Sequence, residues 1–132
     1  MTVNYTTLLG LGQPVTGTEQ GDWGDVVNDS ITSLLDTAVA GTTTISTDAD
    51  ITLTTTTGAS NQARQQIILW TASGTTTRNI TAPAQSKTYT VVNASSTQAI
   101  VIRGVGPTTG VTFAAGETGV VACNGSDFVK IA

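Results

Sequence analysis

Apolar positions change their spacing along the chain, and each spacing predicts a different structure. In residues 1–21 glycines and a proline interrupt the apolar side chains, so no period is established and we expect an extended N-terminal arm. In residues 22–40 apolar side chains recur every three or four positions, which predicts an amphipathic α-helix. Asp22 is its expected N-cap, and Gly41 its expected stop signal.

From residue 42 onward, apolar and polar residues alternate between turn signals. This pattern predicts short strands at about residues 42–46, 50–56, 65–71, 77–82, 87–93, 98–103, 110–114, 118–123 and 127–131. Asn124-Gly125 between the last two is a strong hairpin signal. Short strands at this spacing favour an antiparallel β-sandwich or a jelly-roll-like domain. We therefore expect a mainly-β chain with an extended arm (1–21), an amphipathic helix (22–41) and a β-sandwich domain (42–132), without a clear internal repeat.

Several side chains are expected in the core of the β-domain. Residues 67–70 form a continuous apolar run, which is typical of a central strand covered on both faces. Trp70, Tyr89 and Phe128 lie in strand patterns and are expected to be buried, and Cys123 at a strand end is expected to be a small buried residue.

The composition removes most catalytic chemistry. The chain of 132 residues has no His and one Cys, so it lacks the usual acid–base residue and any pair of cysteines for a disulfide or zinc site. A Ser or Thr nucleophile would then need Lys, Asp or Glu as its base. Lys87 and Lys130 lie in strand patterns and are expected on the surface. The acid pairs Asp48 with Asp50 and Glu117 with Asp127 are explained by turns. We therefore expect no enzyme, no catalytic or metal-binding residues and no cofactor.

Charge and hydropathy argue against a nucleic-acid-binding protein and against a membrane-spanning or secreted one. The net charge is −4, and every Lys and Arg lies after residue 63, while seven of the nine acids lie before it. Few, scattered basic residues argue against nucleic-acid binding. No run approaches about 18 apolar residues, and the N-terminal residues do not resemble a signal peptide, so we expect no membrane span and no secretion.

The remaining candidate function is assembly through apolar surface. The expected assembly interface combines apolar residues of the arm with one stripe of the helix: Leu8, Leu9, Leu11, Val15, Trp23, Val27, Ile31 and Leu34. Fully burying one such side chain stabilises an interface by roughly 1.5–3 kcal/mol before ordering costs. The stripe either covers an open end of the sandwich or packs against copies of itself.

A carbohydrate-binding β-sandwich is an alternative. Such modules present exposed aromatic rings, and only Tyr5 and Phe113 are left free by the expected core and helix stripe. A bound host-surface glycan therefore has little support in the sequence.

Residues 21–28 read Gly-Asp-Trp-Gly-Asp-Val-Val-Asn and lead into the predicted helix. This segment resembles one found in tailed-bacteriophage virion structural proteins, especially minor structural and tail-fibre-like proteins of marine phages. The resemblance extends over most of residues 8–131, including Ala49-Asp-Ile-Thr-Leu, Arg78-Asn-Ile-Thr-Ala-Pro and Gly116-Glu-Thr-Gly.

The resemblance implies a virion part without catalysis, often threefold, assembled in the host cytoplasm. One domain without a coiled-coil shaft favours a capsid decoration, cement or knob subunit, with a tail-fibre or other tail component as the alternative. The partners expected are copies of the chain in a homotrimer, and the major capsid protein or other virion proteins.

Overall fold

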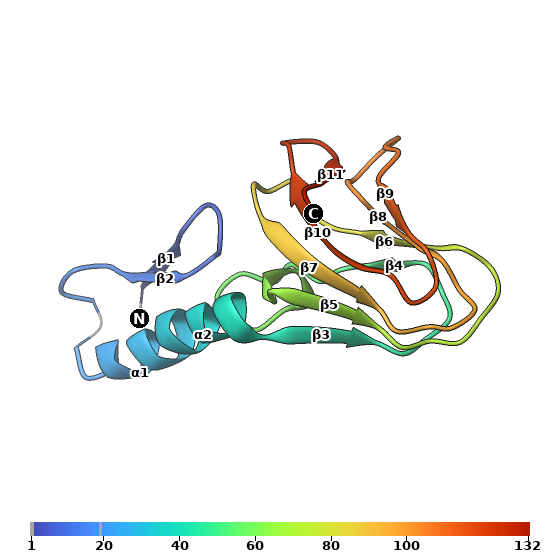
Figure 1. Cartoon of the computed structure of the whole chain (residues 1–132). Helices are drawn as coiled ribbons and strands as arrows, with labels where there is room; N and C mark the ends of the chain where they lie inside the picture. The colour runs from blue at the N-terminus through green and yellow to red at the C-terminus, as the bar shows by residue number, and fades with distance from the viewer. Residues whose placement is uncertain (1, 19) are drawn as a thin grey trace.

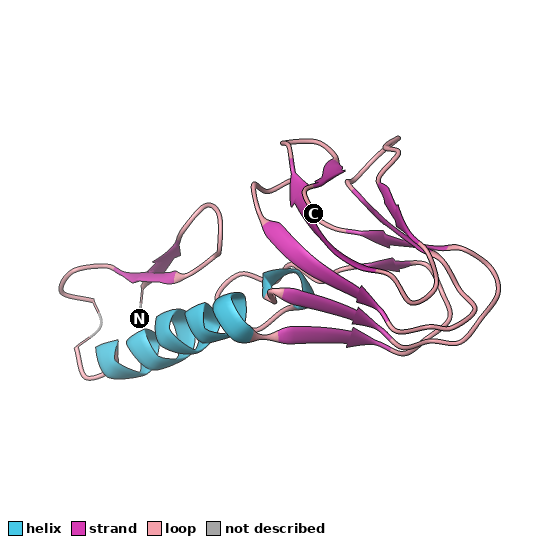
Figure 2. Cartoon of the chain, viewed as in Figure 1, coloured by secondary structure: helices cyan, strands magenta, loops and turns pink. Residues whose placement is uncertain are grey.

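The computed structural model describes residues 2–18 and 20–132, and it divides into an N-terminal module and a β-body (Figures 1 and 2). The N-terminal module contains strands β1 (Val3–Tyr5) and β2 (Gly12–Pro14), followed by one helix built from α1 (Trp23–Val27), η1 (Asn28–Thr32) and α2 (Ser33–Ala40). In Figure 1 this helix extends away from the β-body, with the β1–β2 hairpin beside it.

The β-body contains two sheets. The first has the order β11-β10-β7-β5-β3 and the second the order β4-β6-β8-β9. The strands are β3 (Thr42–Ile45), β4 (Ile51–Thr52), β5 (Ile67–Trp70), β6 (Arg78–Thr81), β7 (Thr88–Asn93), β8 (Ile100–Arg103), β9 (Val111–Phe113), β10 (Thr118–Cys123) and β11 (Phe128–Lys130). Each strand predicted from the alternating pattern corresponds to one of these, so the mainly-β fold is confirmed.

The pairing of the strands differs from the expected antiparallel arrangement. From β3 to β8 the chain alternates between the two sheets, and each strand lies parallel to the one two places earlier. Thr42, Ile67 and Thr90 therefore lie at one level of the first sheet. The β-body thus begins as three successive coils, and antiparallel β9, β10 and β11 complete it. Alternation of apolar and polar residues is the same for both kinds of pairing, so it does not distinguish them.

The core lies between the two sheets. Ile68 of β5 and Val91 of β7 are paired in register, and Ile80 of β6 and Ile102 of β8 are paired likewise, so the coils stack branched apolar side chains. As expected, the core includes Trp70, Tyr89, Cys123 and Phe128. It consists of Ile45, Leu53, Ala63, Ile68, Trp70, Ala72, Ile80, Ala82, Tyr89, Val91, Ile100, Ile102, Phe113, Val121, Cys123 and Phe128.

The helix is confirmed in place, but both of its ends differ in detail from the expectation. Asp22 is the N-cap residue without a side-chain capping hydrogen bond. Gly41 has an extended backbone, not the left-handed conformation of a typical glycine C′ residue. Glycine is required there for space, because a Cβ would lie 2.5 Å from the carbonyl oxygen of Thr37 and would collide with Gln65.

The N-terminal arm is folded as a hairpin and is not simply extended. Val3 pairs with Pro14 and Tyr5 with Gly12 in an antiparallel ladder. Gly12 packs closely on the helix, where a Cβ would lie 2.5 Å from Cβ of Ser30. The hairpin loop also reaches the β-body, because the Gly58 N–H donates to the carbonyl oxygen of Gly10 at 2.9 Å.

Candidate functional site

Large apolar side chains are exposed mainly on the N-terminal module. Leu8 at the hairpin loop and Trp23 at the start of the helix are each 64% exposed. Leu35 is 45% exposed, Val39 68% and Tyr5 46%. We call these five residues the apolar surface. In the described residues of the β-body, the exposed large apolar side chains are Val105, Val129 and Ile131.

The residues proposed from the sequence for assembly fall into three groups. Leu8 and Trp23 are exposed, while Leu9, Leu11, Val15, Val27 and Ile31 are half-buried. Leu34 is 3% exposed, so it packs within the chain and offers almost no surface to a partner. Tyr5 and Val39 were missed as interface candidates, although Val39 continues a spacing of four residues from Trp23 through Val27, Ile31 and Leu35.

A turn of π-helix keeps that spacing on one side of the helix. In an α-helix, positions four apart drift by about 40° per step, so a series of five would spread around the axis. The π-turn η1 (Asn28–Thr32) has more residues per turn and reverses part of this drift. The opposite side carries Val26 and Leu34, which are buried, and the helix contacts β2 and η2 (Gln62–Arg64).

The aromatic residues considered for sugar binding are distributed differently from the expectation. Phe113 is fully buried in the core and is unavailable as a surface ring. Tyr5 is exposed as expected, and the other exposed ring is Trp23 on the helix.

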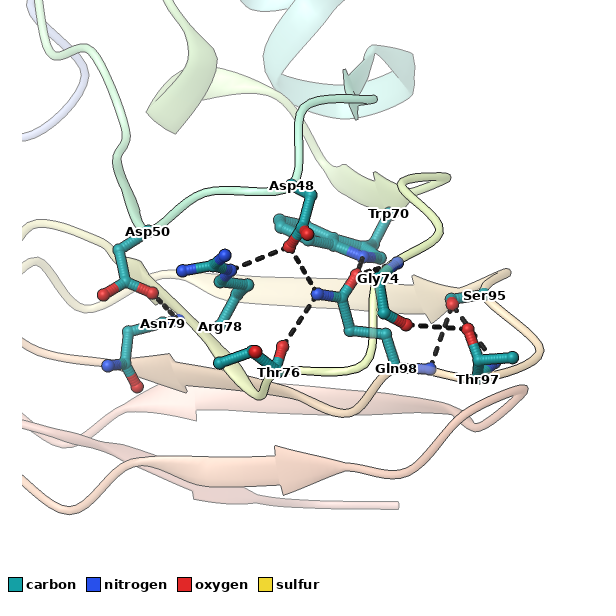
Figure 3. A network of polar contacts seen from close by, with 10 residues as sticks. All are labelled: Asp48, Asp50, Trp70, Gly74, Thr76, Arg78, Asn79, Ser95, Thr97 and Gln98. Carbon is teal, nitrogen blue, oxygen red and sulfur yellow. Dashed lines mark hydrogen bonds and ion pairs between the residues drawn. The ribbon is translucent and has the colours of Figure 1, made fainter.

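A polar network closes one end of the β-body (Figure 3). Gln98 is fully buried, and its Oε1 accepts hydrogen bonds from Trp70 Nε1 at 3.0 Å and from the Gly74 N–H at 3.2 Å. Its Nε2 donates to Asp48 Oδ1 at 2.6 Å and to the carbonyl oxygen of Thr76 at 2.7 Å. One amide therefore joins the turns after β3, β5 and β7.

Arg78 extends this network to the surface. Its Nε forms an ion pair with Asp48 Oδ1 at 2.7 Å. The hydrogen bond from Arg78, followed by that from Gln98, holds the pKa of Asp48 below its usual value. Asp50 accepts a hydrogen bond from the Asn79 N–H at 2.9 Å, so the first acid pair serves the connections between strands.

The second acid pair also has structural partners. Glu117 accepts hydrogen bonds from the Ala114 N–H and from Lys130. The carboxylate of Asp127 accepts four backbone hydrogen bonds, which fasten the loop after β8 to the β10–β11 hairpin. The donors are the N–H groups of Gly104, Thr109, Gly110 and Phe128. Desolvation raises the pKa of Asp127, but these four donors outweigh it and the pKa is lowered.

Arg64 is an unexpected feature, because it is 4% exposed without a carboxylate partner among the described residues. Its guanidinium donates to the carbonyl oxygens of Leu9, Thr56 and Ala59, the last two at 3.2 and 3.1 Å. These bonds join η2 to the hairpin loop and to the loop after β4. The Nε of Arg64 is buried and has no partner in the described structure.

Lys87 is half-buried, so its expected placement on the surface was wrong. Its Nζ donates to the carbonyl oxygen of Gln65 at 3.0 Å and lies 4.6 Å from the centre of the Tyr89 ring. Desolvation, followed by the nearby charge of Arg64, lowers the pKa of Lys87 to about 8.

Comparison with protein-family models, with curated proteins and with solved structures gave no match. Within the described residues, no group of three or more His, Cys, Asp or Glu side chains is placed to hold a metal ion. In the same residues, no helix has the length and apolar character to cross a bilayer.

Proposed function

We propose that this chain is a non-enzymatic structural subunit of a bacteriophage virion. Its role is that of a decoration subunit on the capsid surface, which binds copies of itself and neighbouring virion proteins. The observation that carries the proposal is the apolar surface on the N-terminal module, which extends away from the β-body (Figure 1). The resemblance of residues 21–28 to a segment of phage structural proteins supports a bacteriophage virion as the particle to which the chain belongs.

The apolar surface supplies the driving force for association. A contiguous group of exposed apolar side chains on a small protein marks an interaction site, whereas single exposed ones are ordinary. Within the apolar surface, the residues of the helix form such a group, because they recur at a spacing of four along one side of it. Trp23, Leu35 and Val39 belong to one stripe of the helix. Each side chain that becomes fully buried contributes roughly 1.5–3 kcal/mol. Many such contacts on one particle act together, so the overall binding is stronger than that of any single contact.

The partner of the helix stripe is a second and third copy of the chain. Aspartates supply the charged side chains of the helix, which carries no basic residue, so two copies of the helix cannot form an ion pair and the apolar stripe must supply the contact between them. In a closed symmetric assembly, identical stripes meet around one axis. A homotrimer places three stripes there and leaves the hairpin loop with Leu8 available for a neighbouring virion protein.

A tail appendage is a second candidate, favoured by the coiled arrangement of β3 to β8. Parallel coils stack along one direction, and this architecture suits elongated structures in which subunits follow one another. Both candidates require self-association, and they differ in the location of the chain on the particle.

Crosslinking tests the proposed helix contact. In a symmetric trimer, Val39 of each copy lies near Val39 of its neighbours, so Val39→Cys should form a disulfide-linked dimer on oxidation. Ser33→Cys is the matched control, because Ser33 is exposed and lies on the far side of the helix from Leu35 and Val39. Equal crosslinking of the two variants, or none in Val39→Cys, would contradict the proposed contact.

A further inference from the structure

A small cavity lies between the N-terminal hairpin and the β-body. It has a volume of about 50 Å³, which is room for a few water molecules or one small ion. The hairpin loop (7–10) forms one wall, and the loop after β4 with η2 and the residues before β7 form the others. The described lining includes Arg64 and Lys87 and has no acidic residue.

Arg64 brings a permanent charge to this cavity. A guanidinium stays protonated in proteins, so burial cannot neutralise it. Its terminal nitrogens bond to carbonyl oxygens, which are dipoles without net charge, and its Nε is buried and unpartnered. A buried cation without an opposite charge is costly, because desolvation is not repaid by an ion pair.

Lys87 adds a second cation beside the first. The charge of Arg64 acts on it, and no carboxylate of residues 2–18 and 20–132 offsets this effect. Of the three donors of its ammonium group, one reaches the carbonyl oxygen of Gln65. Thr55, Thr56 and Thr57 also line the cavity and bring hydroxyl groups to its wall.

We propose that this cavity binds one small oxyanion, with Arg64 and Lys87 as its cationic partners. The shared ligand chemistry is that of phosphate, sulfate and carboxylate: compact, anionic and able to accept several hydrogen bonds. The bound anion would offset the positive charge of the two cations and tie the hairpin loop to the β-body. The site does not depend on the proposed trimer contact, since Trp23, Leu35 and Val39 of the helix stripe do not line it.

Calorimetric titration of the full chain with inorganic phosphate tests the site, with chloride added to hold the ionic strength constant. We expect one site per chain. Parallel titrations with sulfate and with acetate show whether a tetrahedral or a planar oxyanion is preferred. Saturable one-to-one binding of any of the three supports the proposal, and absence of binding by all three overturns it.

Two variants with the same change in charge distinguish binding in the cavity from a general attraction of anions to the positive charge of the protein. Lys87→Gln removes one cation of the cavity, and loss of a charged hydrogen bond should weaken binding about tenfold or more. Arg103→Gln removes a cation that bonds instead to Thr108 and Gly106 of its own loop, so binding should be unchanged. Equal weakening in both variants overturns the proposal. Circular dichroism confirms that each variant is folded before it is titrated.

Discussion

The indole nitrogen of Trp70 donates to Oε1 of Gln98 at 3.0 Å, and both side chains are fully buried. The bond crosses from β5 to the turn that follows β7, so it holds neighbouring coils of the β-body together. A buried donor that loses its acceptor costs more than the bond itself contributes, because its desolvation is then uncompensated.

Gln98→Leu should therefore destabilise the fold strongly. The substitution leaves the Trp70 and Gly74 N–H groups without their acceptor, at about 1–3 kcal/mol for the buried indole donor and less for the partly buried Gly74 N–H. Urea unfolding measures the loss, and exposed Thr75→Ala is the control. In a double-mutant cycle with Trp70→Phe, the two effects should be less than additive. Strict additivity would show that the bond does not couple the turns.

Trp23→Ala should have little effect on the stability of the monomer. The ring is 64% exposed, so its removal creates no cavity, and we expect a change below about 1 kcal/mol. Trp70→Ala, by comparison, should cost about 3–5 kcal/mol because Trp70 is fully buried. Both are measured by urea unfolding at a concentration where the chain is dissociated. A large loss in Trp23→Ala there would mean that the ring is buried within one chain.

Because Lys87 loses its proton in the folded state first, the free energy of unfolding should increase as the pH rises from about 8 to 10. Its folded-state pKa is lowered to about 8 from 10.5, so in this interval the unfolded chain binds the proton more completely and folding gains with pH. Burial raises the pKa of Tyr89, so above about pH 10 the unfolded tyrosine ionises first and stability falls again. Unfolding curves across this range should show the rise in the wild type.

The comparison variant for this prediction is Lys87→Met, which cannot titrate. Its free energy of unfolding should lack the rise between pH 8 and 10 and keep the fall above pH 10. If the free energy of unfolding of Lys87→Met rose with pH in parallel with that of the wild type, the rise would come from groups other than Lys87.

Asp127→Asn should loosen the loop after β8. The amide keeps one acceptor oxygen, so two of the four backbone N–H groups lose their partner, at a cost of about 1–3 kcal/mol in this partly exposed site. The lowered pKa means that the carboxylate contributes fully above the unfolded value of 3.8 and loses this contribution as the pH falls through the folded value. Acid unfolding of the wild type and the variant should converge at low pH; a constant difference would contradict this.

The strand positions were predictable from the sequence, but their order in space was not. The apolar run around Ile68 and the alternation of Thr88, Tyr89, Thr90 and Val91 each locate a strand whatever its partner. The coils place Thr43, Ile68 and Val91 at one level, and these residues share no motif that would reveal a repeat. The connections between coils also differ in length, so parallel stacking leaves no period in the sequence.

The candidate surfaces were predictable only in part. The apolar stripe was visible, but the π-turn changes the phase of the helix, so Leu34 is buried and Val39 is exposed. Arg64 lies in a polar loop sequence, where an arginine is ordinarily solvated. Arg64 is buried because the hairpin loop lies against it. The guanidinium donates to the carbonyl oxygen of Leu9 in that loop, which is 55 residues away in the sequence.

The solution mass of the full chain, measured by light scattering at several concentrations, tests the proposed assembly most directly. We expect a discrete species near three times 13.4 kDa for the wild type. Leu35→Asp with Val39→Asp should give a monomer, and Ser33→Asp, on the far side of the helix, should remain a trimer. A wild-type chain that is monomeric at every concentration, or a stripe variant that assembles as well as the wild type, would contradict the account.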